Sequence, residues 1–216
     1  METKFEIVPV PTRILTHHDD IVEAIVEYGG DKIGPDDVVC VAESVVAITQ
    51  GGAKRSEDFK PGLLAKVLCR LFPSKGSISG WHSMQALIDA EGGMRVLIAV
   101  ICGFAAKCVG VSGVFYRMAG EQARLIDDVT GTMPPYDKHI FYGPHNPIKV
   151  AEEITSGTGA FGAAVADVND LKRSCVLGVS KGVNADEVAQ ILIDNPFGNG
   201  SQKTPVVVIK NYRRAR

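Results

Sequence analysis

Residues 148–179 read IKVAEEITSGTGAFGAAVADVNDLKRSCVLGV, and the order of the patterns within them decides the fold class. Residues 148–154 have the spacing of a helix, whereas residues 160–166 and 175–179 are short apolar runs that predict strands. Working outward from this stretch, predicted strands alternate with predicted helices along most of the chain. Such alternation is typical of an α/β or α+β protein, so we expect a mixed β-sheet with flanking helices.

The remaining elements follow from the same reasoning. Residues 120–147 form the least regular stretch, and a loop of this length inside a domain is often functional. No internal repeat or low-complexity linker occurs, so residues 1–216 are expected to form one domain or two interlocked halves. Further strands are predicted at residues 5–10, 38–42, 95–101 and 205–210, further helices at 21–29, 63–72, 82–90 and 185–193, and a loop at 49–60.

Composition excludes several classes of protein. A hydrophobic fraction of 45% with 22% charged residues is ordinary for a globular chain, and a net charge of -2 gives no footprint for nucleic acid. The N-terminus lacks the pattern of a signal peptide. The most apolar run, residues 96–114, is divided by glycines into pieces the length of strands. We therefore expect a cytoplasmic protein without a nucleic-acid or membrane partner.

Cysteine usage points to a reducing compartment. The number of cysteines is odd and no Cys-x-x-Cys motif occurs, so neither a disulfide framework nor a zinc ribbon is indicated. Four of the five lie in apolar runs, which predicts buried free thiols. The five are Cys40, Cys69, Cys102, Cys108 and Cys175.

Two acidic clusters are candidates for a metal site. Asp127 and Asp128 follow the apolar pair Leu125-Ile126, and a second cluster of Asp167, Asn169 and Asp170 follows an apolar strand-like run. Carboxylate and amide oxygens at strand ends suit Mg²⁺ or Mn²⁺. About forty residues with one helix separate the clusters, so two neighbouring strands could bring them to one ion. The alternative is a helix cap or an Asx-turn for the first cluster and a polar turn for the second, and a sheet protein with two acidic turns would bind no metal.

The order of these motifs resembles the coenzyme F-420 γ-glutamyl ligase family. The similarity rests on Pro11-Thr12-Arg13-Ile14, on residues 37–46 followed by Gln50-Gly51, and on the aspartates after two strand-like runs. Residues 195–207 are similar to the closing turn and strand of the family. The resemblance implies a ligase-like fold and Mg²⁺ or Mn²⁺ at Asp127, Asp128, Asp167 and Asp170. It also implies GTP or ATP near Thr12, Arg13 and Asn169.

The resemblance further implies a homodimer and the formation of an amide bond between a carboxylate and an amino acid. Where the family carries two lysines and an arginine in its second block, this sequence has Ser44, Ile48 and Gly52. Loss of three cations weakens the match to the same phosphates and polyanionic substrate. We therefore expect a divergent ligase for a carboxylate other than F-420. The alternative is a non-catalytic nucleotide- or metal-binding protein descended from the same family.

Overall fold

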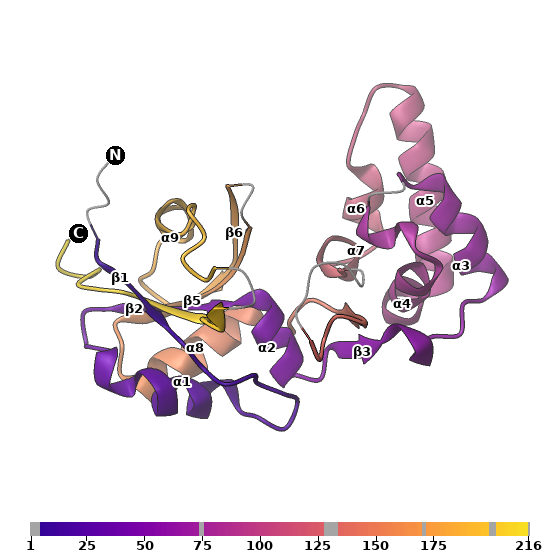
Figure 1. Cartoon of the computed structure of the whole chain (residues 1–216). Coiled ribbons are helices and arrows are strands. Elements are labelled where there is room, and N and C mark those ends of the chain that lie inside the picture. Colours follow the sequence, from indigo (N-terminus) through magenta and orange to yellow (C-terminus); the bar gives the residue numbers. More distant parts are fainter. Residues whose placement is uncertain (1–4, 74–75, 128–133, 170–171, 199–201, 216) are drawn as a thin grey trace. The chain divides into compact units, whose positions relative to one another are not determined.

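The computed structural model describes residues 5–73, 76–127, 134–169, 172–198 and 202–215. The chain divides into two compact units (Figure 1). Unit 1 combines Met1–Gly51 with Pro144–Arg216, and unit 2 is Gly52–Gly143. In sequence, unit 2 is therefore an insertion between the two halves of unit 1.

A five-stranded mixed sheet forms the centre of unit 1. The order across it is β1-β7-β2-β5-β6, with β2 parallel to β5 and with antiparallel pairing at β1–β7, β7–β2 and β5–β6. Strands β1, β2 and β5 consequently run in one direction, and their carboxyl ends lie at one edge of the sheet. The strands are β1 Ile7–Val10, β2 Val38–Ala42, β5 Gly162–Asn169, β6 Arg173–Val179 and β7 Val206–Ile209.

Alternate side chains of β2 enter two different cores. Val39 and Val41 pack with α1 (Ile21–Gly29) and α8 (Pro147–Thr158) on one face of the sheet. Val38 and Cys40 pack on the other face, in a cluster that includes Tyr212 and residues of α9 (Ala185–Ile191). Burial on both faces explains why this strand is a continuous apolar run. The predicted sheet with flanking helices is confirmed (Figure 1).

Unit 2 is mainly helical and has a core of its own. Met84, Leu87, Val96 and Ile140 are fully buried at its centre. Its elements are the antiparallel pair β3 (Ala53–Arg55) and β4 (His139–Phe141), with helices α3 (Leu63–Leu68), α4 (Trp81–Glu91), α5 (Gly93–Cys108), α6 (Val114–Met118) and α7 (Gln122–Leu125). Short 3-10 turns occupy Gly30–Lys32 in unit 1, and Ser56–Asp58, Cys69–Leu71 and Ser77–Ser79 in unit 2.

The predicted strand at residues 95–101 is wrong, because these residues lie inside α5. A helix that is apolar on all sides shows no 3.6-residue period, and its sequence then resembles a buried strand. Gly103 does not break the segment. A Cβ atom there would lie 2.9 Å from Cβ of Phe115, so glycine allows α6 to approach α5 closely.

Burial of the cysteines also differs from the prediction. Cys40 and Cys69 are buried, whereas Cys108 and Cys175 are exposed and Cys102 is intermediate. All five are free thiols. Among the described residues, no helix combines the length and the apolarity that crossing a bilayer would require.

Candidate functional site

Polar residues follow each of the three strands that end at the same edge of unit 1. Thr12 comes two residues after β1, and Glu43 directly follows β2. Asp167 and Asn169 are among the last three residues of β5. Ala42 of β2 pairs with Ala166 of β5, so Glu43 and Asp167 each follow a residue of the same cross-strand pair. The carboxyl ends of parallel strands are where sheet proteins of this class bind ligands.

Cys175 reports on the charge at this edge. It lies opposite Asp167 in the β5–β6 pairing. Partial burial raises the pKa of the Cys175 thiol, and the negative charges of Asp167 and Glu43 raise that pKa further. The two carboxylates therefore act on one thiol, although they come from residues 124 positions apart in the sequence.

The side chains at this edge carry oxygen donors of the kind that hard cations take. Among the residues that the structure describes, no three His, Cys, Asp or Glu side chains are grouped so that they could enclose a metal ion. Mg²⁺ commonly takes one or two carboxylates from a protein and its other oxygens from water and a nucleotide. Glu43 and Asp167, with the carboxamide of Asn169, supply such a partial set. Asp170 lies outside the described residues.

The first acidic cluster is placed differently from the prediction. Asp127 belongs to unit 2 and follows the short helix α7, not a strand, because the N–H of Ile126 donates to Gln122 O at 2.9 Å and closes a helical turn. Its backbone forms an isolated bridge with Phe141, and Ser77 Oγ donates to its Oδ1 at 3.2 Å. Asp128 lies outside the described residues. That Asp127 and Asp167 share one ion stays a prediction.

Thr12 and Arg13 follow β1, and each already has a contact. The Thr12 N–H donates to the carbonyl of Lys203 at 2.8 Å, and the Thr12 side chain is buried. The Arg13 guanidinium donates to both carboxylate oxygens of Asp19. These hydrogen bonds hold the pKa of Asp19 well below its usual range. A nucleotide phosphate at Arg13 would have to share this ion pair.

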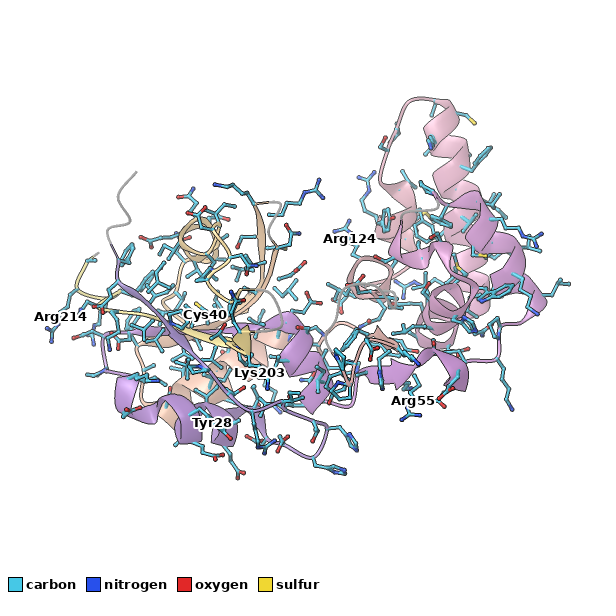
Figure 2. All side chains as sticks on the ribbon, in the orientation of Figure 1. Tyr28, Cys40, Arg55, Arg124, Lys203 and Arg214 are labelled. Atoms are coloured by element: carbon cyan, nitrogen blue, oxygen red, sulfur yellow. The ribbon has the colours of Figure 1, made fainter. Side chains whose placement is uncertain are left out.

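The positions that lack the cations of the family are not equivalent. Ser44 is exposed and Ile48 is buried, both on α2 (Glu43–Thr49), whereas Gly52 belongs to unit 2. Ile48 therefore occupies a site where a lysine or arginine head group would lose its hydration. Lys203 is exposed beside Thr12, and its ammonium group makes no ion pair with a described residue (Figure 2).

The family can be identified from the chain as a whole. The model of the F420-0:gamma-glutamyl ligase family matches residues 9–159, which is more than half of the 216 residues. The chain belongs to the F420-0:gamma-glutamyl ligase family. No curated protein matches it significantly.

The family match includes only some of the residues at this edge of the sheet. It runs from β1 through α8 and includes all of unit 2, with Thr12, Glu43 and Asp127. It ends before β5, so the family match itself does not include Asp167 or Asn169. Their place at the site rests on the register between β2 and β5.

Two residues at this edge of the sheet were missed by the sequence reasoning. Glu43 stands directly after a buried strand, the same signal that pointed to Asp167, but it was considered only as part of residues 37–46. Lys203 could not be found from sequence, since it reaches the edge through pairing of β7 with β1 and β2.

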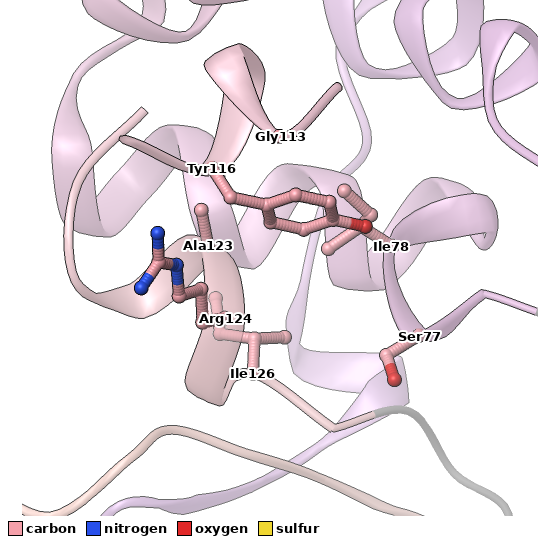
Figure 3. A pocket seen from close by; sticks show the side chains of 7 residues that line it. All are labelled: Ser77, Ile78, Gly113, Tyr116, Ala123, Arg124 and Ile126. Carbon is pink, nitrogen blue, oxygen red and sulfur yellow. The ribbon is translucent and has the colours of Figure 1, made fainter. Parts of the chain in front are cut away.

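Unit 2 of this family member also has a pocket of about 370 Å³ (Figure 3). Tyr116 lies across it, above Ile126 and Ala123, and Arg124 and Ser77 lie at its rim. Arg124 makes no ion pair with a described residue. The pocket adjoins Asp127 through the hydrogen bond from Ser77.

Proposed function

We propose that the chain is a metal- and nucleotide-dependent ligase that joins an amino acid to a small-molecule carboxylate other than the F-420 precursor. Membership of the F420-0:gamma-glutamyl ligase family supports a ligase-type function. The observation that carries the rest is the pair of carboxylates, Glu43 and Asp167, after paired residues of two parallel strands. GTP or ATP would supply the energy of the reaction.

The chemistry has two steps. An oxygen of the substrate carboxylate attacks the γ-phosphorus of the nucleotide, the bond to the bridging oxygen breaks, and the nucleoside diphosphate leaves. The amine nitrogen then attacks the carbonyl carbon of the acyl phosphate, the carbon–oxygen bond to phosphate breaks, and the amine proton passes to solvent or phosphate. A bound Mg²⁺ or Mn²⁺ would offset charge on the phosphate oxygens.

The side chains at the strand ends have separate roles in this proposal. Glu43 and Asp167 would hold the cation, and Asn169 with Thr12 and Arg13 would contact the nucleotide. Lys203, close to Thr12, would face the negative charge of the phosphates. Asp127, Asp128 and Asp170 remain proposed metal ligands. No side chain has to act as a covalent nucleophile.

Turnover and metal binding test the proposal separately. Release of phosphate from GTP or ATP should depend on Mn²⁺, on an amino acid and on a carboxylate drawn from a panel of small acids, with the amide product seen by mass spectrometry. Calorimetry should show Mn²⁺ binding that Asp167→Asn and Glu43→Gln each weaken about tenfold or more.

Asp194→Asn serves as the matched control, because this exposed carboxylate pairs with Lys172 and should leave the affinity unchanged. Equal Mn²⁺ affinity in the wild type and in Asp167→Asn would remove the metal site from β5. The same titration on Asp127→Asn tests whether that residue shares the ion.

A non-catalytic nucleotide- or metal-binding protein is the second candidate. Ile48 favours this candidate, because it is buried where the family carries a cation. A lysine at this position would lose its hydration, so a single substitution would not restore the missing charge. Nucleotide binding in calorimetry without amino-acid-dependent phosphate release would select this candidate.

A further inference from the structure

The outer face of α5 lacks polar side chains. Met94, Ile98, Ile101 and Phe104 lie on the side of the helix that faces away from the core of unit 2, and 48–69% of each side chain is exposed. Ala105 and Cys108 complete this face. Surface helices of globular proteins normally carry charged or polar residues there, and helices that are apolar all round are covered by something.

A second exposed apolar stripe lies on the adjoining helix. Leu63, Val67 and Leu71 follow each other at helical spacing along α3 and the turn after it, and they are 79%, 50% and 58% exposed. Helices α3 and α5 are in contact. We call the two stripes together the apolar surface of unit 2. Exposed apolar side chains gathered on neighbouring helices mark sites of interaction with a protein or a membrane.

The segment of sequence that contains both stripes is positively charged. Between Phe59 and Gly120 the sequence has seven Lys or Arg and two Asp or Glu, a net charge of +5, so the rest of the chain carries -7. One of the two acids, Glu91, is paired with Arg95. Lys66 is exposed on α3, Arg70 is exposed in the 3-10 turn that follows it, and Lys107 is exposed on α5.

We propose that the apolar surface of unit 2 docks on an anionic lipid bilayer. Apolar side chains beside lysine and arginine are what a helix lying in the interface of such a bilayer needs, since the apolar groups enter the acyl boundary and the cations meet lipid phosphates. A second copy of the chain fits less well. Two copies that met through this surface would bring the net charge of +5 on each segment toward the same charge on the other copy.

This docking would be peripheral and reversible. Composition led us to expect no membrane partner. The net charge of the whole chain hides this segment, because it adds the +5 of the segment to the -7 of the remaining residues. The docking does not depend on the ligase proposal, since α3 and α5 belong to unit 2 and the strand-end carboxylates to unit 1.

Flotation of the purified full chain with vesicles tests the proposal. We expect several-fold more protein bound to vesicles of phosphatidylcholine with about a third phosphatidylglycerol than to phosphatidylcholine alone. The double variant Ile101→Asp/Phe104→Asp should lower the bound fraction about tenfold. Ile148→Asp is the matched control, because Ile148 is 57% exposed on α8 of unit 1, and it should bind as the wild type does.

Lys66→Glu/Arg70→Glu changes no apolar residue and should lower binding to the anionic vesicles alone. Ile101→Ser/Phe104→Ser replaces the aspartate pair if circular dichroism shows that pair to be unfolded. Equal binding of the wild type to both vesicles, or no binding, would overturn the proposal. So would light scattering in which the aspartate pair converts a dimer to a monomer, because the surface would then belong to a second copy.

Discussion

Gln50 and His145 are joined by two reciprocal hydrogen bonds. The His145 N–H donates to Gln50 Oε1 at 2.7 Å, and Gln50 Nε2 donates to the His145 carbonyl at 3.0 Å. They are 95 residues apart and lie at the two points where the chain leaves and re-enters unit 1. Within unit 2, the Tyr142 N–H donates to the Gly52 carbonyl at 2.9 Å. The two segments that connect the units are therefore hydrogen-bonded to each other both in unit 1 and in unit 2.

Gln50→Ala should loosen this pairing without disturbing either core. Loss of two partly exposed hydrogen bonds is expected to cost about 1–2 kcal/mol of stability. The amide of His145 should exchange with deuterium faster, while amides of β2 and β5 keep the protection of the wild type. Gln190→Ala removes an equally exposed glutamine from α9 and should change neither quantity. Unchanged exchange at His145 would show that the backbone holds the segments unaided.

Asp37 and Lys210 form the most buried ion pair among the described residues. Burial raises the pKa of Asp37, but hydrogen bonds from Lys210 and from the N–H groups of Asn211 and Gly34 outweigh it and lower that pKa below its ordinary value. A lowered pKa in the folded state contributes stability above the unfolded pKa of about 3.9, and this contribution is lost as the pH falls through the folded value.

Asp37→Asn should therefore lower the free energy of unfolding by about 2–4 kcal/mol at neutral pH. The variant should also lose less stability than the wild type when the pH falls below about 4. Urea unfolding between pH 3 and 7 measures both effects. Asp194→Asn breaks an ion pair whose side chains are 71–75% exposed, and it should cost less than about 1 kcal/mol. A parallel loss of stability in the two variants would mean that burial of Asp37 gives no additional stability.

Cys175 gives a readout of the strand-end carboxylates that needs no substrate. Partial burial and the charges of Asp167 and Glu43 raise the pKa of its thiol, and the thiolate is the reactive form. Asp167→Asn or Glu43→Gln should therefore speed alkylation of Cys175 at pH 8 by about twofold or more. Peptide mass spectrometry separates it from Cys108, an exposed thiol in unit 2 that serves as the internal control. Equal acceleration at both thiols would point to a general loosening of the fold.

The sheet of unit 1 could be predicted because its local signals agree with its packing. Val38–Ala42 is buried on both faces and has no polar residue, so its pattern and its boundaries coincide. The helix predicted at residues 21–29 begins directly after Asp20, whose side chain accepts hydrogen bonds from the N–H groups of Val22 and Glu23. In each case, nearby residues alone determine the structure.

Unit 2 and parts of the site could not be predicted in this way. The exposed face of α5 is as apolar as its buried face, so residues 95–101 show no helical period. Strands β3 and β4 are three residues each and pair across 83 intervening residues. The proximity of Glu43 to Asp167 depends on the order of strands in the sheet, which periodicity does not encode. Such contacts follow from tertiary packing and not from local propensity.

Pairing of two chains through the sheet of unit 1 remains a proposal from the family resemblance. Light scattering at micromolar protein should give a mass near 46 kDa, twice the 23.1 kDa of one chain. If the sheet is the interface, Ile101→Asp/Phe104→Asp in unit 2 leaves this mass unchanged. A mass of one chain for the wild type would exclude the homodimer.

The chain should not extend the F-420 precursor with glutamate, even if it is a ligase. The precursor and a nucleotide triphosphate bring several negative charges into one site, and each charge-assisted hydrogen bond contributes about 1.5–3 kcal/mol. With Ser44, Ile48 and Gly52 in place of three cations, the loss is roughly 4 kcal/mol, or about a thousandfold in rate. Of the cations that could compensate, Lys172 pairs with Asp194 and Arg55 with Glu57. The Lys54 ammonium group lies 5.3 Å from the centre of the Tyr142 ring, and Lys203 lies beside Thr12.

Incubation with the precursor, glutamate, GTP and Mn²⁺ tests this prediction by mass spectrometry, with an authentic ligase of the family run in parallel. Ser44→Lys adds one cation at an exposed position next to Glu43, and it should strengthen GTP binding about tenfold if Ser44 faces the phosphates. Ser156→Lys adds the same charge on α8 and controls for net charge. Product from the wild type at a rate comparable with the authentic ligase would show that the charges supplied by Lys203 and its neighbours suffice.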